Sequence, residues 1–227
     1  MFELYIGNKN YSSWSLRCWV LMRELAIPFR EHLVPFGGAA TPESFRAFSP
    51  TGKVPCLVDG ALTVWDSLAI TEYLAERHAG VWPADATARA FARSAAAEMH
   101  SGFGALRAHC TMNCGIRVKL SAISAALASD LRRLEALWAD GIARFGGPFL
   151  AGAQFCAADA FFAPVAFRIQ SYEPPLAPAA RRYAASLLDL LSMKEWYAAA
   201  LAESWRDEPH EIEARGAGEW TQDLRAH

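Results

Sequence analysis

Three serine hydroxyls in one short polar segment are the first groups in the chain that could do chemistry. Ser12, Ser13 and Ser15 follow a predicted strand at residues 2–6, and a predicted helix through residues 18–25 begins beside them. A helix N-terminus offers free N–H donors and the positive end of the helix dipole, which stabilise a thiolate and lower its pKa. The serines carry no redox sulfur, so they could donate a hydrogen bond to a sulfur that a ligand brings. Ordinary helix capping is the alternative interpretation of these residues.

A second segment, from Thr51 to Ile70, has the features of a clamp for a small acidic peptide. Pro55 stands where a short strand should begin, and a proline cannot donate a ladder hydrogen bond. A cis Val54–Pro55 bond would turn the N–H and C=O groups of Val54 away from the sheet, where an extended peptide could pair with them. Further along, Asp66 and Ser67 open a helix whose N-terminus favours a carboxylate.

The elements that must position these two segments form an α/β unit over residues 1–80. Strands are predicted at residues 2–6, 29–34, 56–58 and 62–64, and helices through 18–25, 42–48 and 66–78, in the order β-α-β-α-β-β-α. A linker at residues 79–85 precedes a helical second part, residues 87–227. Helices are predicted there at 87–110, 117–145, 157–170, 179–191 and 193–204, and the segment from Asp207 is expected to wrap the surface. The prediction is an α/β domain followed by an all-α domain.

Composition excludes several classes of protein. Of 227 residues, 53% are hydrophobic and 20% charged, which favours a large buried core over disorder. The net charge is −2 and no basic block occurs, so a nucleic-acid partner is not expected. Apolar runs are too short to span a bilayer, and the first residues do not form a signal sequence, so a cytoplasmic protein is predicted. The five cysteines form no Cys-x-x-Cys pair or zinc-ligand spacing, and we expect buried free thiols and no metal.

Three motifs in combination resemble the cytosolic glutathione transferases, especially the serine-type bacterial, theta and zeta members. They are Ser-Ser-x-Ser-x-Arg at residues 12–17, Gly-Lys-Val-Pro-x-Leu at 52–57 and Asp-Ser-Leu-Ala-Ile-x-Glu-Tyr-Leu at 66–74. Ser12-x-x-Ser15 has the spacing that thioredoxin-like redox proteins fill with Cys-x-x-Cys. In the second part, residues 152–159 resemble the family's helix-start motif, with Cys156 where Ser or Thr is usual and with the motif's Asp159.

The resemblance implies a thioredoxin-like domain that binds glutathione as co-substrate, a helical domain that contributes the electrophile pocket, and a homodimer. Ser12 matches the zeta-type hydroxyl that contacts the thiolate, whereas counting back from Arg17 in the theta manner selects Ser13. Val54, after which Pro55 supplies the cis bond, would pair with the cysteinyl backbone. Asp66 and Ser67 would hold the γ-glutamyl end. Lys53 would neutralise the glycyl carboxylate, and its alternative is a solvated turn lysine.

The substrate pocket is predicted from apolar residues near the serines. Its candidates are Tyr11, Trp14, Met99, Phe103, Leu106 and Met112, although aromatic and methionine residues at helical spacing are commonly core residues. The expected function is conjugation of glutathione to a small hydrophobic electrophile, in detoxification. One alternative is a maleylacetoacetate-like cis-trans isomerase, but zeta enzymes have a cysteine at the Trp14 position and an arginine at the Ser171 position, where only the nearby Arg168 could substitute. A non-catalytic protein that binds glutathione is the other alternative.

Overall fold

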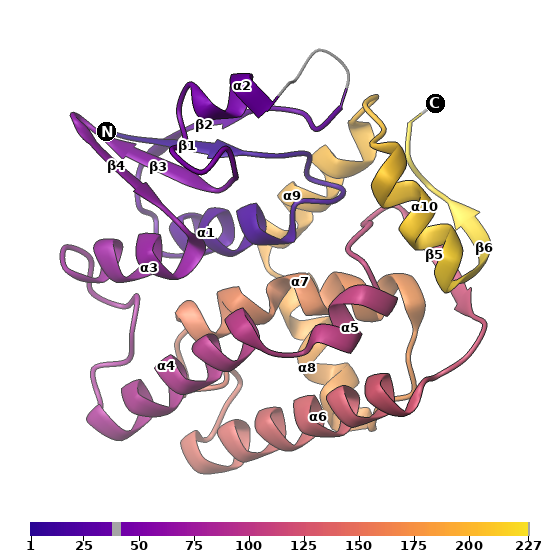
Figure 1. Cartoon of the computed structure of the whole chain (residues 1–227). Coiled ribbons are helices and arrows are strands. Elements are labelled where there is room, and N and C mark those ends of the chain that lie inside the picture. The colour runs from indigo at the N-terminus through magenta and orange to yellow at the C-terminus, as the bar shows by residue number, and fades with distance from the viewer. Residues whose placement is uncertain (38–41, 227) are drawn as a thin grey trace.

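The first domain is a four-stranded sheet with helices on both faces. The computed structural model describes residues 1–37 and 42–226, so most of the loop predicted before Pro42 lies outside the described residues. The elements are β1 (Phe2–Ile6), α1 (Ser13–Glu24), β2 (Phe29–Leu33), α2 (Pro42–Arg46), β3 (Cys56–Asp59), β4 (Leu62–Trp65) and α3 (Ser67–Ala75). The strand order is β2-β1-β3-β4, with β1 and β2 parallel and the other pairs antiparallel. In Figure 1, α1 and α3 lie between this sheet and the helical part.

Local sequence explains these elements. Phe2, Leu4 and Ile6 alternate with less buried residues along β1, as a strand with one face on the core requires. Gly60 takes a positive φ of 60° in the tight turn between β3 and β4, a conformation that glycine adopts without strain. The predicted β-α-β-α-β-β-α order and the thioredoxin-like α/β fold are therefore confirmed.

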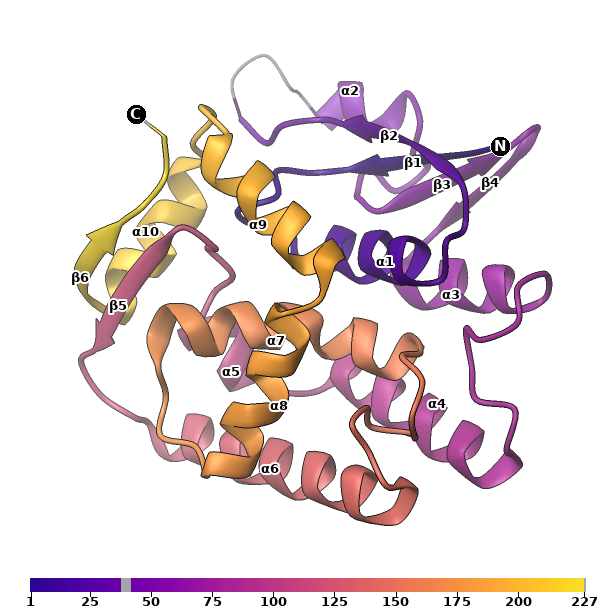
Figure 2. The same cartoon turned by 180° about the vertical axis from the view of Figure 1, so that it is seen from behind.

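The second part is organised around one buried helix. Its elements are α4 (Ala86–Ser101), α5 (Gly104–His109), β5 (Ile116–Leu120), α6 (Ala125–Phe145), α7 (Ala157–Tyr172), α8 (Pro178–Leu188), α9 (Leu191–Ala202), α10 (Glu208–Ala217) and β6 (Gly218–Asp223). The apolar helix α7 packs against α1, α4 and α8, and thus joins the two parts of the chain (Figures 1 and 2). Among the described residues, no helix combines the length and the apolar character that crossing a membrane requires.

Three predicted boundaries in the second part are wrong. The helix predicted at 87–110 is broken at Gly102 and Phe103, and Phe103 has a φ of 52° in the left-handed region. The helix predicted from Arg117 begins only at Ala125, because residues 116–120 form β5 and alternate Ile-Arg-Val-Lys-Leu. Its partner β6 and the preceding α10 occupy the segment predicted to lack regular structure. The second part is thus helical with one added two-stranded sheet.

All five cysteines are free and buried, as predicted. Cys156 begins α7, and Asp159 three residues later supplies the acceptors at this helix start. The Asp159 carboxylate accepts hydrogen bonds from the N–H groups of Leu150 and Cys156, both at 3.0 Å, and from the Tyr183 hydroxyl at 2.8 Å. Asp159 is fully buried, so water could not replace its carboxylate as the acceptor for these three donors.

We expect Asp159→Ala to lower the free energy of unfolding by about 3 kcal/mol, because each buried donor left unpaired costs about 1–3 kcal/mol. Urea denaturation measures the change. Asp140→Ala is the matched control, because Asp140 is an exposed helix residue in a surface ion pair with Arg144; we expect it to change stability by less than about 0.5 kcal/mol. An Asp159→Ala protein as stable as the control would contradict this role.

Candidate functional site

A cavity of 830 Å³ lies where the first domain meets α5, α7 and α10. Its walls come from residues far apart in the sequence: Tyr11, Ser12, Ser13, Trp14, Phe36, Phe45, Gly52, Lys53, Val54, Gly104, Arg107, Ala108, Thr111, Met112, Arg168, His210 and Glu213. Both segments singled out by the sequence therefore reach this cavity, the serine segment from the start of α1 and residues 52–54 from the turn before β3. The cavity is the candidate functional site.

The serine segment turns sharply at the start of α1. The Ser12 backbone N–H donates to the Asn8 carbonyl at 2.8 Å, which closes the turn, and the Ser12 side chain makes no capping hydrogen bond. Instead the Ser12 hydroxyl donates to Ser15 Oγ at 2.7 Å, and Ser15 Oγ also accepts the Gly7 N–H at 3.1 Å. Ser15 is fully buried and does not line the cavity, whereas Ser12 and Ser13 do. The capping alternative therefore does not describe the Ser12 side chain.

The segment before Pro55 borders the cavity. The Val54–Pro55 bond is cis, as predicted, and Val54 lies before Cys56, the first β3 residue paired with β1. Val54 and Lys53 both line the cavity. Lys53 is exposed, and its backbone N–H donates to Ser49 Oγ at 3.4 Å. The backbone of Val54 is thus next to the sheet but outside its ladder.

Asp66 and Ser67 form the start of α3, as predicted. Asp66 has a φ of 72° and accepts the Leu68 N–H at 2.8 Å. The Ser67 side chain is 1% exposed and its Oγ has no hydrogen-bond partner among the described residues. Neither residue lines the 830 Å³ cavity, but His100 lies between Asp66 and the cavity wall. Its Nε2 is 3.5 Å from Asp66 Oδ2, and its ring contacts that of Trp14 edge-on with centroids 5.2 Å apart. Burial lowers the pKa of His100, and the nearby arginines 17 and 107 lower it further, although Asp66 opposes them.

Only some of the residues predicted for the substrate pocket line the cavity. Tyr11, Trp14 and Met112 line the cavity. Met99, Phe103 and Leu106 do not; they are at most 5% exposed and belong to the hydrophobic core. The break at Gly102–Phe103 explains the correction, because it changes the direction of the chain and turns Phe103 against Phe162 of α7.

The C-terminal segment contributes to the site, which the sequence did not predict. His210 of α10 stacks on the Tyr11 ring with centroids 5.1 Å apart, and the Tyr11 hydroxyl donates to Glu211 at 2.7 Å. Arg225 pairs with Glu211 and also donates to the Tyr11 hydroxyl at 3.2 Å. Burial and the Glu211 carboxylate raise the pKa of Tyr11, so this phenol stays protonated. No local pattern near residue 11 indicates a partner some 200 residues away.

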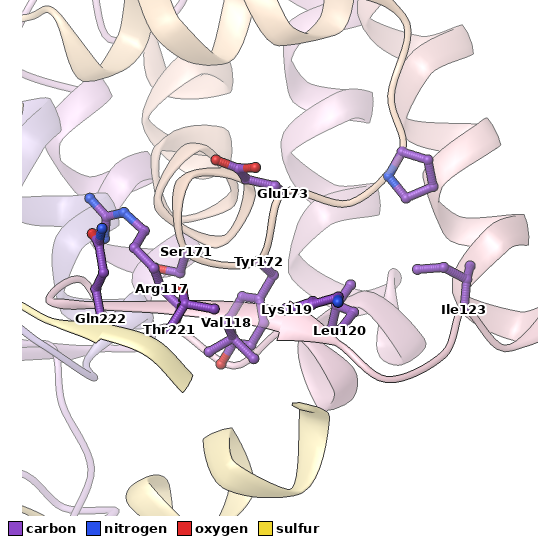
Figure 3. Close-up of a pocket in the computed structure, with 11 residues that line it drawn as sticks. Arg117, Val118, Lys119, Leu120, Ile123, Ser171, Tyr172, Glu173, Thr221 and Gln222 are labelled. Carbon is purple, nitrogen blue, oxygen red and sulfur yellow. Dashed lines mark hydrogen bonds between the residues drawn. The ribbon is translucent and has the colours of Figure 1, made fainter. Parts of the chain in front are cut away.

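A second cavity, of 540 Å³, lies between β5, β6 and the end of α7 (Figure 3). Two of its polar side chains, Arg117 and Ser171, are engaged with the protein. Arg117 donates to the carbonyl oxygens of Cys114 and Ile116 and to the Tyr197 hydroxyl. Ser171, at the position where zeta enzymes carry an arginine, is buried and donates to the Asn113 carbonyl. None of the predicted glutathione-site residues lines this cavity. Among the described residues no group of three or more His, Cys, Asp or Glu side chains could hold a metal ion.

Comparison with known proteins identifies the first domain. Residues 11–77 match the family model of the glutathione S-transferase N-terminal domain. A segment of 65 residues is 45% identical to dichloromethane dehalogenase from Methylorubrum extorquens, and it covers 27% of this chain and 23% of that protein. A dichloromethane dehalogenase from Methylophilus leisingeri is 42% identical over 59 residues, 25% of this chain and 22% of that protein. The similarity thus spans less than a quarter of either relative.

The whole fold resembles solved glutathione transferases. A theta class glutathione S-transferase from Xanthomonas axonopodis pv. citri, with glutathione bound, is 26% identical with a TM-score of 0.61, and the match covers 86% of this chain and 96% of that one. Glutathione transferase Omega 3C from Trametes versicolor is 18% identical with a TM-score of 0.68, covering 95% and 91%. Residues 11–77 of this chain are therefore similar to the glutathione S-transferase N-terminal domain, within a chain whose fold is that of the solved glutathione transferases.

Proposed function

We propose that the protein is a cytoplasmic, detoxifying glutathione transferase, which binds glutathione in the 830 Å³ cavity and joins its sulfur to a small electrophile. The observation that carries this proposal is the approach of Ser12, Ser13 and Val54 to one cavity. The family match of residues 11–77 supports it independently.

Each part of the tripeptide has a partner of suitable chemistry in this proposal. The backbone of Val54 pairs with the cysteinyl unit, as an added strand would. The N-terminus of α3 takes the γ-glutamyl carboxylate, where the buried and unpaired Ser67 Oγ is a further donor, and Asp66 meets the ammonium group. Lys53, exposed at the cavity wall, neutralises the glycyl carboxylate.

Ser12 stabilises the thiolate in this arrangement. Because the Ser12 hydroxyl donates to Ser15 Oγ in the structure, this role requires both hydroxyl hydrogens to rotate. Ser15 Oγ, which accepts the Gly7 N–H, then donates its own hydrogen to Ser12 Oγ. Ser12 then presents its hydrogen to the sulfur at the start of α1, where the helix dipole adds to the effect. Each unit by which the thiol pKa falls corresponds to about 1.4 kcal/mol.

The test is retention on glutathione resin combined with conjugation of a chloronitrobenzene, followed by loss of free thiol. The proposal predicts both binding and thiol loss. A protein that binds glutathione without any turnover is instead the non-catalytic binding protein, and cis-trans conversion of a maleyl substrate without thiol loss identifies the isomerase. Failure to bind glutathione at all contradicts every one of these assignments.

We also propose that two copies associate through β4 and α3. Leu62 is 53% exposed and Trp65 is 44% exposed, and a hollow of 630 Å³ runs from β4 onto the first turns of α3. Exposed apolar side chains beside a sheet edge are typical of an interface. In light scattering, the wild type is expected as a dimer and Trp65→Glu as a monomer. Trp205→Glu, at a tryptophan 47% exposed elsewhere, is the control that should stay dimeric; a monomeric wild type contradicts the proposal.

A further inference from the structure

Three arginines converge on the helical wall of the cavity. Arg107 of α5 and Arg168 of α7 line it, and Arg17 of α1 does not line it but contacts the ring of Trp14, which does. The Arg17 guanidinium carbon is 4.1 Å from the centroid of the Trp14 ring, and that of Arg107 is 5.6 Å from the same ring. One indole thus contacts two positive charges from different elements.

None of these three arginines forms an ion pair with a described residue in residues 1–37 and 42–226. Arg168 is 5% exposed; its Nη1 donates to the carbonyl oxygens of Arg107 and Cys110, and its Nε has no hydrogen-bond partner in the described part of the chain. Arg17 is 1% exposed, and no described residue accepts a hydrogen bond from its Nε or Nη1.

The carboxylates around the cavity compensate for this charge only in part, because Asp66 raises the pKa of Arg17 by less than burial and the neighbouring arginines lower it. Asp66 is engaged with the Leu68 N–H and with His100, and Asp130 accepts the Leu106 N–H. Glu213 lines the cavity from α10 but is exposed to solvent. Burial, and secondarily the charge of the neighbouring arginines, lowers the pKa of Arg17. An unpaired buried charge is expensive, so this cluster needs an anion that the described chain does not supply.

Glutathione does not supply that anion in the proposed function, because its two carboxylates meet the start of α3 and Lys53. We propose that the electrophile itself carries a carboxylate, which Arg107 and Arg168 bind at the helical wall. This inference rests on the proposed function and differs from the expectation of a small hydrophobic electrophile in adding one charged group. In the reaction of a chloroarene acid, the thiolate sulfur forms a bond to the aryl carbon, chloride leaves with the bonding electron pair, and the thiol proton goes to water.

The test uses 4-chloro-3-nitrobenzoate and its methyl ester, which differ in the charge of one group. The ratio of kcat/KM for the acid to kcat/KM for the ester is measured in wild type, Arg107→Gln, Arg168→Gln and Arg144→Gln. Intrinsic reactivity cancels when this ratio is compared between variants. Arg144 is the matched control, an exposed arginine of α6 paired with Asp140. Circular dichroism melting checks folding, and the half-buried Arg107 provides the test if Arg168→Gln does not fold.

We expect the ratio to fall about 10- to 100-fold in Arg107→Gln and in folded Arg168→Gln, as for loss of a charged hydrogen bond, and to stay unchanged in Arg144→Gln. The KM for glutathione should stay within about twofold. An unchanged ratio overturns the inference, and a raised KM for glutathione with an unchanged ratio assigns the arginines to the tripeptide. If the wild type conjugates neither compound, the proposed function fails. Binding of the acid in calorimetry, with loss of that binding in Arg107→Gln, would then still support the anion site. Absence of binding of the acid to the wild type would overturn the anion site as well.

Discussion

Ser12→Ala is expected to lower kcat/KM for glutathione conjugation by about 10- to 100-fold and to abolish the ultraviolet absorbance of enzyme-bound thiolate at neutral pH. A hydrogen bond to a charged group contributes about 1.5–3 kcal/mol, and its loss raises the pKa of the bound thiol. The KM for glutathione should change little, because the tripeptide is held by Val54, Lys53 and the start of α3. Steady-state kinetics and a thiol titration by absorbance measure the two effects.

Ser13→Ala is the control for this prediction. Ser13 also lines the cavity, but the Ser12 hydroxyl, and not that of Ser13, is coupled to the buried Ser15. We expect Ser13→Ala to retain most of the activity and the thiolate absorbance. The reverse result, a silent Ser12→Ala and an inactive Ser13→Ala, would transfer the role to Ser13, as the theta-type count suggests.

Arg225→Met is expected to lower the free energy of unfolding by about 3–5 kcal/mol, the usual cost of breaking a buried ion pair. The Arg225 and Glu211 side chains are 2% and 4% exposed, and Arg225 also pairs with Asp223 at 2.6 Å. The change leaves the Glu211 charge buried and loosens the contact of α10 with Tyr11. Chemical denaturation measures the loss of stability. Glu211→Leu combined with Arg225→Met should recover much of it, because no uncompensated charge then remains at Glu211.

The same pair predicts a pH dependence. Burial alone would raise the pKa of Glu211, but the hydrogen bonds from Arg225, Tyr11 and Asn113 lower it, and Arg225 lowers the pKa of Asp223. A carboxyl group whose pKa is lower in the folded than in the unfolded protein stabilises the fold. This contribution is complete above the unfolded pKa, near pH 4, and is lost as the pH falls through the pKa of the folded state. The stability difference between wild type and Arg225→Met should therefore shrink below about pH 4. A difference that stays constant there would contradict the assignment.

The sequence predicted the first domain closely because its signals are local. The alternation of Phe2, Leu4 and Ile6, the proline at position 55 and the Asp66 helix start each act within a few residues. The cis bond and the approach of Val54 to the serines followed from the same motifs. The sequence did not predict the hydrogen bond between Ser12 and Ser15, because the packing of the first turn of α1 decides which serine hydroxyl points inward.

The second part was harder because its decisive contacts are distant in sequence. β5 has an alternating sequence, but its partner strand, residues 218–223, lies about a hundred residues away and shows no periodicity of its own. Arg107 has no local signal, since exposed and cavity-lining arginines look alike on a helix. His210 and Glu213 reach the cavity through α10, which the sequence did not reveal.

The most direct measurement is a crystal structure of the protein with glutathione. The account predicts that the sulfur lies within hydrogen-bond distance of Ser12 Oγ, that the cysteinyl backbone pairs with Val54 and that the γ-glutamyl carboxylate meets the start of α3. A tripeptide seated in the cavity of Figure 3, or a sulfur that contacts neither Ser12 nor Ser13, would contradict it.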